Sequence, residues 1–176
     1  VAIPVFNERM RYDMPEFDPL WAAAEANEMP ISLHISTNRP AQDSPELARR
    51  YAVQAGTTLH AGHSTQPLFL QYLLVNGDYW ARQSLGDMIL SGVFERFPNL
   101  HVGAVETEMA WAVHWLRMID LHYTDTPPGN MGYRFKNEML PSDFFRRNCF
   151  IDTQEDFQGI KLRDQIGVDN RLWGND

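Results

Sequence analysis

Apolar residues follow a helical period in some stretches of the chain and form short continuous runs in others. Phe17, Leu20, Trp21 and Ala24 recur at i, i+3, i+4 and i+7, which predicts an amphipathic helix. Short runs rich in β-branched residues predict strands. On these patterns we expect strands over 1–6, 31–35, 100–105, 149–152 and 171–173, and helices over 16–28, 47–75, 79–97, 109–121, 142–147 and 155–166.

This alternation of strands with helices predicts βαβ units, and therefore an α/β fold built on a parallel sheet. The chain has 176 residues, whereas a complete (β/α)8 barrel typically needs ~250. Val1 already lies in a predicted strand, and Asp176 comes three residues after the apolar Leu172-Trp173 of another. We therefore expect a single domain over 1–176 that is incomplete at its N-terminus and at its C-terminus. Ser142 is expected to cap the helix that follows it.

Composition and charge exclude several classes of partner. The chain is 44% hydrophobic and 22% charged, which is typical of a globular domain. Its net charge is -8 and it has no basic run, so we expect neither a nucleic acid nor a membrane as a partner. Cys149 is the only cysteine, which rules out a disulfide framework and suggests a small core residue in a cytoplasmic protein.

Polar residues stand where the predicted strands end. In parallel α/β folds, ligands bind at the carboxyl ends of the strands, so these residues are candidates for chemistry. Each one alone is weak evidence, but their convergence on one edge of the sheet is stronger evidence. They are Asn7 with Glu8, His34, Glu106, Asp152 with Thr153, and Asn175 with Asp176.

His34 ends the apolar run Ile31-Ser32-Leu33. Its imidazole could bind a metal through one nitrogen while a carbonyl or carboxylate holds the other. It could equally be a buried histidine that bonds to the backbone, and the residues alone weigh the two alternatives about evenly.

Asp176 and Glu106 are the two candidate catalytic carboxylates. Asp176 follows Gly174 and could bind a metal and take a proton from metal-bound water, or it could cap a following helix. Glu106 could be a ligand or general base, or it could stabilise the N-terminus of the 109–121 helix together with Glu108.

Other candidates are weaker. His60 and His63 form an H-x-x-H pair that we favour as a loop, although His63 could touch substrate, as could Asn7. His101 is expected inside a strand and is interpreted as structural, like two histidines on the following helix, His114 and His122. Arg146 and Arg147 could bind an anion, but charge at a helix end is the favoured interpretation.

Four segments in order carry a family resemblance. They are P-I-S-L-H-I-S-T, G-V-F-E-R-F-P-N-L-H-V-G-A-V-E-T-E-M-A-W-A-V-H-W-L-R-M-I-D, F-F-R-R-N-C-F-I-D-T and I-G-V-D-N-R-L-W-G-N-D. Together they resemble the amidohydrolase-related family, the branch of the amidohydrolase superfamily that includes the aminocarboxymuconate semialdehyde and γ-resorcylate decarboxylases. The resemblance runs over essentially the whole chain.

The resemblance implies a partial (β/α)8 barrel of about strands four to eight, with one divalent metal ion, expected to be zinc, at the strand ends. The family's strand-five histidine, a metal ligand, maps onto His34. Its strand-eight aspartate, a ligand or general base, maps onto Asp176. The strand-six histidine of the decarboxylases is replaced by Glu106 here, and no segment corresponds to the ligand pair of strand one.

The resemblance implies an enzyme with a small-molecule substrate, and a homo-oligomer is compatible with it. We expect a metal-dependent hydrolase in which Asp176 accepts a proton from metal-activated water and Glu106 orients the reactants. Glu106 tilts this choice slightly away from the alternative, a metal-dependent non-oxidative decarboxylase of an aromatic or unsaturated carboxylic acid. A second alternative is a partial barrel without activity.

Overall fold

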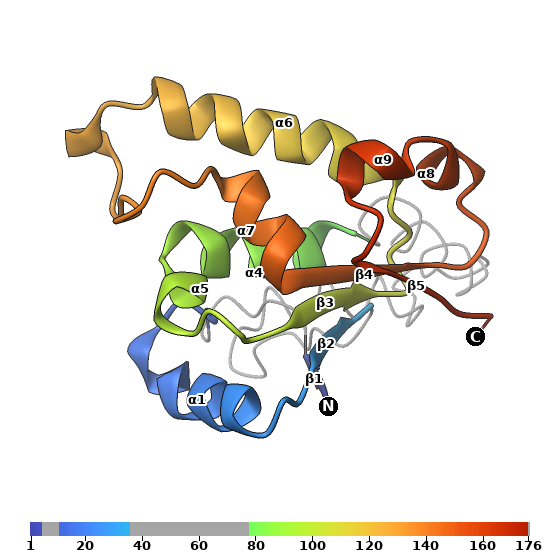
Figure 1. The fold of residues 1–176 in the computed structure, drawn as a ribbon, viewed down its shortest axis with the longest axis horizontal. Helices are drawn as coiled ribbons and strands as arrows, with labels where there is room; N and C mark the ends of the chain where they lie inside the picture. Colours follow the sequence, from blue (N-terminus) through green and yellow to red (C-terminus); the bar gives the residue numbers. More distant parts are fainter. Residues whose placement is uncertain (5–10, 36–77, 176) are drawn as a thin grey trace, which may run out of the picture.

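The computed structural model describes residues 1–4, 11–35 and 78–175 (Figure 1). Its five strands form one parallel sheet in sequential order. All five predicted strands are therefore confirmed, whereas the helix predicted over 47–75 lies outside the described residues. The strands are β1 (Ala2–Pro4), β2 (Ile31–His34), β3 (Val102–Val105), β4 (Cys149–Thr153) and β5 (Arg171–Trp173).

Helices connect the strands, and α4 and α7 lie against β3 and β4. Figure 1 shows α6 on the far side of α7 from the sheet, with α8 and α9 beside the start of α6. Helix α1 lies on the opposite side of the picture. The helices are η1 (Pro15–Phe17), α1 (Asp18–Ala26), α4 (Tyr79–Leu90), α5 (Val93–Arg96), α6 (Ala110–Asp125), η2 (Pro128–Asn130), α7 (Pro141–Asn148), α8 (Phe157–Lys161) and α9 (Arg163–Ile166).

Alternate strand residues make the core between the sheet and the helices. Leu33, Ala104 and Ile151 occupy neighbouring registers of β2, β3 and β4 and are fully buried. Phe144 and Phe145 of α7 belong to the same apolar cluster. Because successive strand residues point to opposite faces, His34 and Asp152, one position further along, face away from this core.

Gly103 of β3 is required by the close approach of the neighbouring strand. A Cβ atom at this position would overlap the ring of Phe150 on β4. The glycine therefore leaves room for the ring of Phe150 against β3, on the face that also carries His34.

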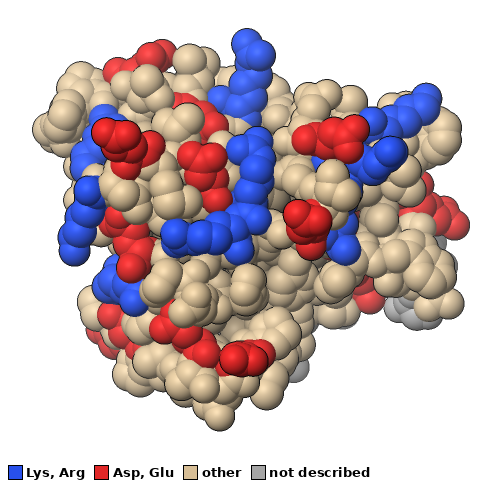
Figure 2. Space-filling model, in the orientation of Figure 1, with Lys and Arg blue, Asp and Glu red and all other residues tan. Residues whose placement is uncertain are grey.

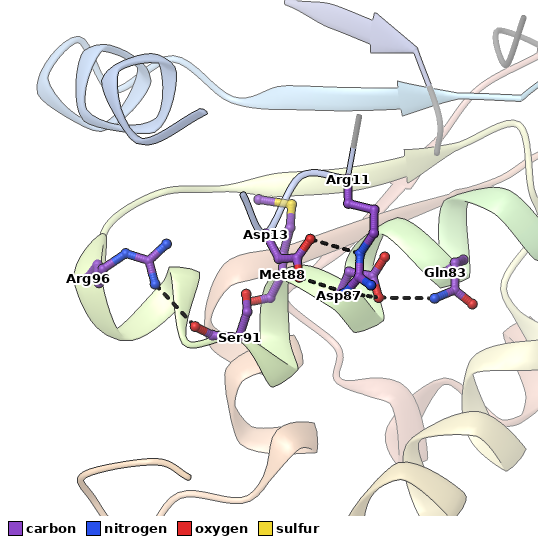
Figure 3. Close-up of polar contacts among 7 residues, drawn as sticks. All are labelled: Arg11, Asp13, Gln83, Asp87, Met88, Ser91 and Arg96. Atoms are coloured by element: carbon purple, nitrogen blue, oxygen red, sulfur yellow. Dashed lines mark hydrogen bonds and ion pairs between the residues drawn. The ribbon is translucent and has the colours of Figure 1, made fainter. Parts of the chain in front are cut away.

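A polar cluster ties the segment before α1 to α4 (Figure 3). Arg11 donates to both carboxylate oxygens of Asp13, at 3.0 and 2.6 Å, and its Nη2 lies 3.6 Å from Asp87 Oδ1. Gln83 donates to the same Asp87 oxygen at 3.0 Å. Burial is the main cause of a raised Asp87 pKa; the charge of Asp13 adds to it, and Arg11 and Gln83 oppose it.

The amino ends of β3 and β4 are joined by side chains at the end of α7. Asn148 is fully buried, and its Nδ2 donates to the carbonyls of Pro98 and Leu100, both at 2.9 Å. Arg147 donates to Asn148 Oδ1 at 2.8 Å and to the Phe94 carbonyl at 2.8 Å. Arg147 lies in the last turn of α7, as the helix-end interpretation expected, and its bonds connect this turn to α5.

Several local predictions were wrong. Ser142 does not cap α7: the helix begins at Pro141, the Leu140 amide donates to Asp143 Oδ2 at 2.9 Å, and the Ser142 amide donates to Asp120 Oδ1. Proline suits the first helical position because its missing N–H would have no partner there.

Three further predictions differ in detail from the structure. The helix predicted over 155–166 is divided at Leu162 into α8 and α9, although Gly167 ends it as expected, with φ of 125°. Leu20, predicted to be in the apolar stripe of α1, is 39% exposed. His101 precedes β3 and is exposed, rather than lying inside the strand.

Cys149 is buried, as predicted, and burial raises the pKa of its thiol. Acidic and basic side chains are interspersed on the face shown in Figure 2. In the described ranges, no helix has the length and apolar character needed to cross a membrane.

Candidate active site

Three polar side chains meet where β2, β3 and β4 end. His34 is the last residue of β2 and pairs in register with Val105, the last residue of β3. Glu106 follows directly, and its Oε1 lies 3.1 Å from His34 Nε2. The Glu106 amide donates to Asp152 Oδ1 of β4 at 2.7 Å. The parallel register thus brings together three residues that the sequence placed at strand ends.

The backbone determines which nitrogen of His34 faces Glu106. His34 Nδ1 lies 3.0 Å from the carbonyl oxygen of Ile35, which can only accept, so Nδ1 carries the hydrogen. In the neutral ring the Nε2 lone pair then faces the Glu106 carboxylate, and two acceptors at this distance need a cation between them. A proton or a divalent metal ion satisfies that need, and imidazole and carboxylate are ordinary ligands for such metals.

Asp152 is the most buried of the three side chains, with 7% of its surface exposed. Burial is the largest cause of its raised pKa, and the charges of Glu106 and Glu108 add to it. The amide of Glu106 and the imidazole of His34 act in the opposite direction. Asp152 thus lies in a crowded, acidic environment that favours a nearby positive charge.

The segment after β3 adopts an uncommon backbone conformation. Glu106 has φ of 60° and Glu108 has φ of 54°, the left-handed region that favours glycine. Each such residue costs about 1–2 kcal/mol. This backbone persists because hydrogen bonds from the end of β4 hold it.

Glu108 provides one half of that support. Its carboxylate accepts hydrogen bonds from Thr153 Oγ1 at 3.0 Å, the Gln154 amide at 3.2 Å and the Glu155 amide at 3.1 Å. A carboxylate from the β3 side therefore holds the loop that follows β4. Bonds of this kind to an ionised acceptor are stronger than neutral ones.

Asp156 provides the other half. Its Oδ2 accepts from the amides of Met109 and Ala110, at 2.8 and 2.5 Å, and its Oδ1 accepts from the Gly159 amide at 2.7 Å. One side chain thus satisfies amides at the start of α6 and of α8. The alternative role for Glu106 and Glu108 was to stabilise the N-terminus of α6. That prediction is wrong: neither lies in the first turn of the helix, and its first amides donate to Asp156. We call Glu108 and Asp156 the reciprocal carboxylate pair.

Three other predicted site residues lie outside the described part of the chain: Asn7, His63 and Asp176. Within 1–4, 11–35 and 78–175, no group of three or more His, Cys, Asp or Glu side chains is arranged to hold a metal ion. His34 and Glu106 therefore offer part of a ligand shell. The sequence places Asp152 at the end of a predicted strand, and this position is the signal that identifies it as a site residue.

No protein-family model matches the chain. The chain is 23% identical over 173 residues to the γ-resorcylate decarboxylase of Rhodococcus jostii (strain RHA1). The aligned region covers 94% of this chain and 44% of that protein. This relative confirms the expected resemblance to the γ-resorcylate decarboxylases.

Solved structures of decarboxylases are similar in fold. The 5-carboxyvanillate decarboxylase of Sphingomonas paucimobilis superposes with a TM-score of 0.66 at 24% identity, covering 100% of this chain and 47% of that one. That of Novosphingobium aromaticivorans, complexed with manganese and 4-hydroxy-3-methoxy-5-nitrobenzoic acid, has a TM-score of 0.69 at 15% identity, covering 100% and 46%.

These comparisons confirm the α/β fold predicted as part of a (β/α)8 barrel. The chain spans about half the length of the proteins it matches. The metal bound in the Novosphingobium structure is manganese, so the expected zinc is not supported there.

Proposed function

We propose that this chain supplies about half of the active site of a divalent-metal-dependent, non-oxidative decarboxylase that acts on an aromatic carboxylic acid. The observation that carries the proposal is the 3.1 Å approach of His34 Nε2 to Glu106 Oε1 at adjacent strand ends. The activities of the relatives support a decarboxylase over the hydrolase that the sequence favoured, while both share a metal at this edge. The meeting of His34, Glu106 and Asp152 at adjacent strand ends gives no support to the inactive alternative.

The proposed metal ligands in this chain are His34, through Nε2, and Asp176; the remaining ligands would come from the rest of the barrel. Manganese is the first candidate and zinc the second. A bound divalent ion would supply positive charge that holds and orients the substrate carboxylate. Because the Ile35 carbonyl lies against Nδ1, Nε2 is the nitrogen that we assign to the metal.

Glu106 is the proposed proton donor. A protonated Glu106 gives its proton to the ring carbon that bears the carboxylate, the bond to that carboxylate breaks, and its electron pair restores the aromatic ring. The products are carbon dioxide and a ring that carries hydrogen at that carbon. Asp176 is proposed as a further catalytic carboxylate, and Asn7 and His63 as substrate contacts. A cytoplasmic setting and assembly into homo-oligomers remain predictions.

The test uses the full-length protein that contains this chain. We expect it to purify with about one divalent metal ion per chain and to release carbon dioxide from γ-resorcylate or 5-carboxyvanillate. His34→Ala should lose most of the metal and more than about 100-fold in activity. His101→Ala is the matched control, because His101 is an exposed imidazole before β3.

Two results would contradict the proposal in different ways. Full metal occupancy in His34→Ala would overturn the ligand assignment. Turnover of lactones or amides without any decarboxylation would replace the decarboxylase with the hydrolase.

A further inference from the structure

We propose that Asp152 is a positioning residue that aims the Glu106 carboxylate at His34 by holding the Glu106 backbone amide; this inference rests on the role proposed for Glu106. The contact is a 2.7 Å hydrogen bond from the Glu106 amide to Asp152 Oδ1. Asp152 lies on β4 and Glu106 follows β3, so the bond joins two strand ends.

The need for such a bond comes from the backbone of Glu106. Its φ of 60° is a conformation that side-chain-bearing residues rarely adopt. Without a partner for the amide, this residue would favour an extended or helical backbone, and its side chain would turn away from the 3.1 Å contact with His34. Asp152 makes the uncommon conformation favourable by offering an ionisable acceptor where the amide points.

The surroundings of Asp152 suit a positioning role. The side chain is 7% exposed, so it does not present a free face to a substrate. Its other oxygen, Oδ2, lies 3.8 Å from the place where a Cβ of Gly174 would stand, so Asp152 also adjoins the segment that follows β5. The side chain therefore lies between two strand ends, and Glu106 is the residue through which it acts.

Two variants of the full-length protein separate the hydrogen bond from the negative charge. Asp152→Asn keeps a carbonyl oxygen that can accept the Glu106 amide, whereas Asp152→Ala does not. For the acid that the wild type accepts as a substrate, we expect Asp152→Ala to lower kcat by about 10–100-fold with little change in KM. The kcat of Asp152→Asn should stay within about threefold of the wild-type value.

A matched control removes an equivalent bond far from the site. Asp120 Oδ1 accepts the Ser142 amide at 2.8 Å, so Asp120→Ala also deletes a carboxylate that holds a backbone amide. We expect this control to lower the melting temperature while leaving kcat unchanged. An unchanged kcat in Asp152→Ala, or an equal loss in Asp152→Asn and Asp152→Ala, would overturn the inference, the first pointing to a purely structural role and the second to a role of the charge.

Hydrogen exchange of the Glu106 amide provides a readout that needs no activity. Exchange should be faster in Asp152→Ala than in the wild type, and Asp152→Asn should restore most of the protection. Protection that is unchanged in Asp152→Ala would overturn the inference even in an active enzyme. If the wild type decarboxylates neither acid, the proposed function fails, and the exchange data still decide whether Asp152 holds Glu106.

Discussion

The two ends of β3 and β4 differ in the chemistry that satisfies their backbone groups. At the carboxyl ends, Asp152, Glu108 and Asp156 accept hydrogen bonds from amides. At the amino ends, Asn148 and Arg147 donate to carbonyls. Part of the difference follows from the βα arrangement, because Asp156 accepts amides at the starts of α6 and α8, whereas Arg147 donates to a carbonyl in the last turn of α5.

The two ends of β3 and β4 are therefore expected to differ in what they contribute to the protein. Carboxylates that satisfy amides also concentrate negative charge beside His34, which favours a cation at that edge. The donors at the other end are neutral or positive, and they bond to backbone carbonyls and, in the case of Arg147, also to the side chain of Asn148. We therefore expect changes at the amino end to affect folding, and changes at the carboxyl end to affect the site as well.

The largest effect on stability is expected for Asn148→Ala. It leaves the carbonyl of buried Leu100, and that of Pro98 at a more exposed position, without their donor, so the free energy of unfolding should fall by about 2–3 kcal/mol. Chemical denaturation measures this loss, and Asn130→Ala, at an exposed position, is the control. Activity per folded molecule should be unchanged; a tenfold drop would break the separation between the two ends.

An intermediate effect is expected for Glu108→Gln. A glutamine amide offers one acceptor oxygen and turns an NH2 group toward donors that Glu108 now satisfies, so we expect a loss of about 1–2 kcal/mol. The 153–155 backbone should also exchange hydrogen faster. Glu155→Gln removes the same charge from an exposed neighbour, and equal effects of the two variants would show that charge, rather than hydrogen bonding, matters.

The smallest effect is expected for Asp87→Asn, which tests a buried carboxylate held by side chains rather than by backbone amides. Because the pKa of Asp87 is raised in the folded protein, the folded state binds its proton more tightly than the unfolded state does. The wild type therefore loses stability as pH rises from the ordinary aspartate pKa through the raised one.

Asparagine cannot titrate, so the stability of the variant relative to the wild type should increase over this pH range. The loss of the weak ion pair with Arg11 offsets part of this increase, which leaves a net difference of about a few tenths of a kcal/mol. Thermal melts of both proteins between about pH 3 and 7 measure the difference. A difference that shrinks as pH rises would contradict the cause assigned to the shift.

The strands and the meeting of His34 with Glu106 could be predicted from the sequence. Short apolar runs mark buried parallel strands, and polar residues after adjacent strands must lie at the same edge. This logic required no knowledge of side-chain geometry, and it also brought Asp152 into consideration.

The support around Glu106 could not be predicted from the sequence. Nothing local indicates a positive φ at Glu106 or Glu108, because both are poor residues for that conformation. The bonds that hold them come from residues 45 to 47 positions away, so no short motif encodes them. The start of α7 differs from the prediction for a local reason, because Asp143 accepts a hydrogen bond from the Leu140 amide three residues earlier and Ser142 does not cap the helix.

The reciprocal carboxylate pair also has a consequence for motion. Glu108 holds the loop after β4, and Asp156 of that loop holds the start of α6. Neither loop can lift away without releasing the amides of the other, so the two should open together as one cooperative unit with a shared rate. Any entry or exit of a molecule past this edge would then be timed by a single opening event rather than by two independent ones.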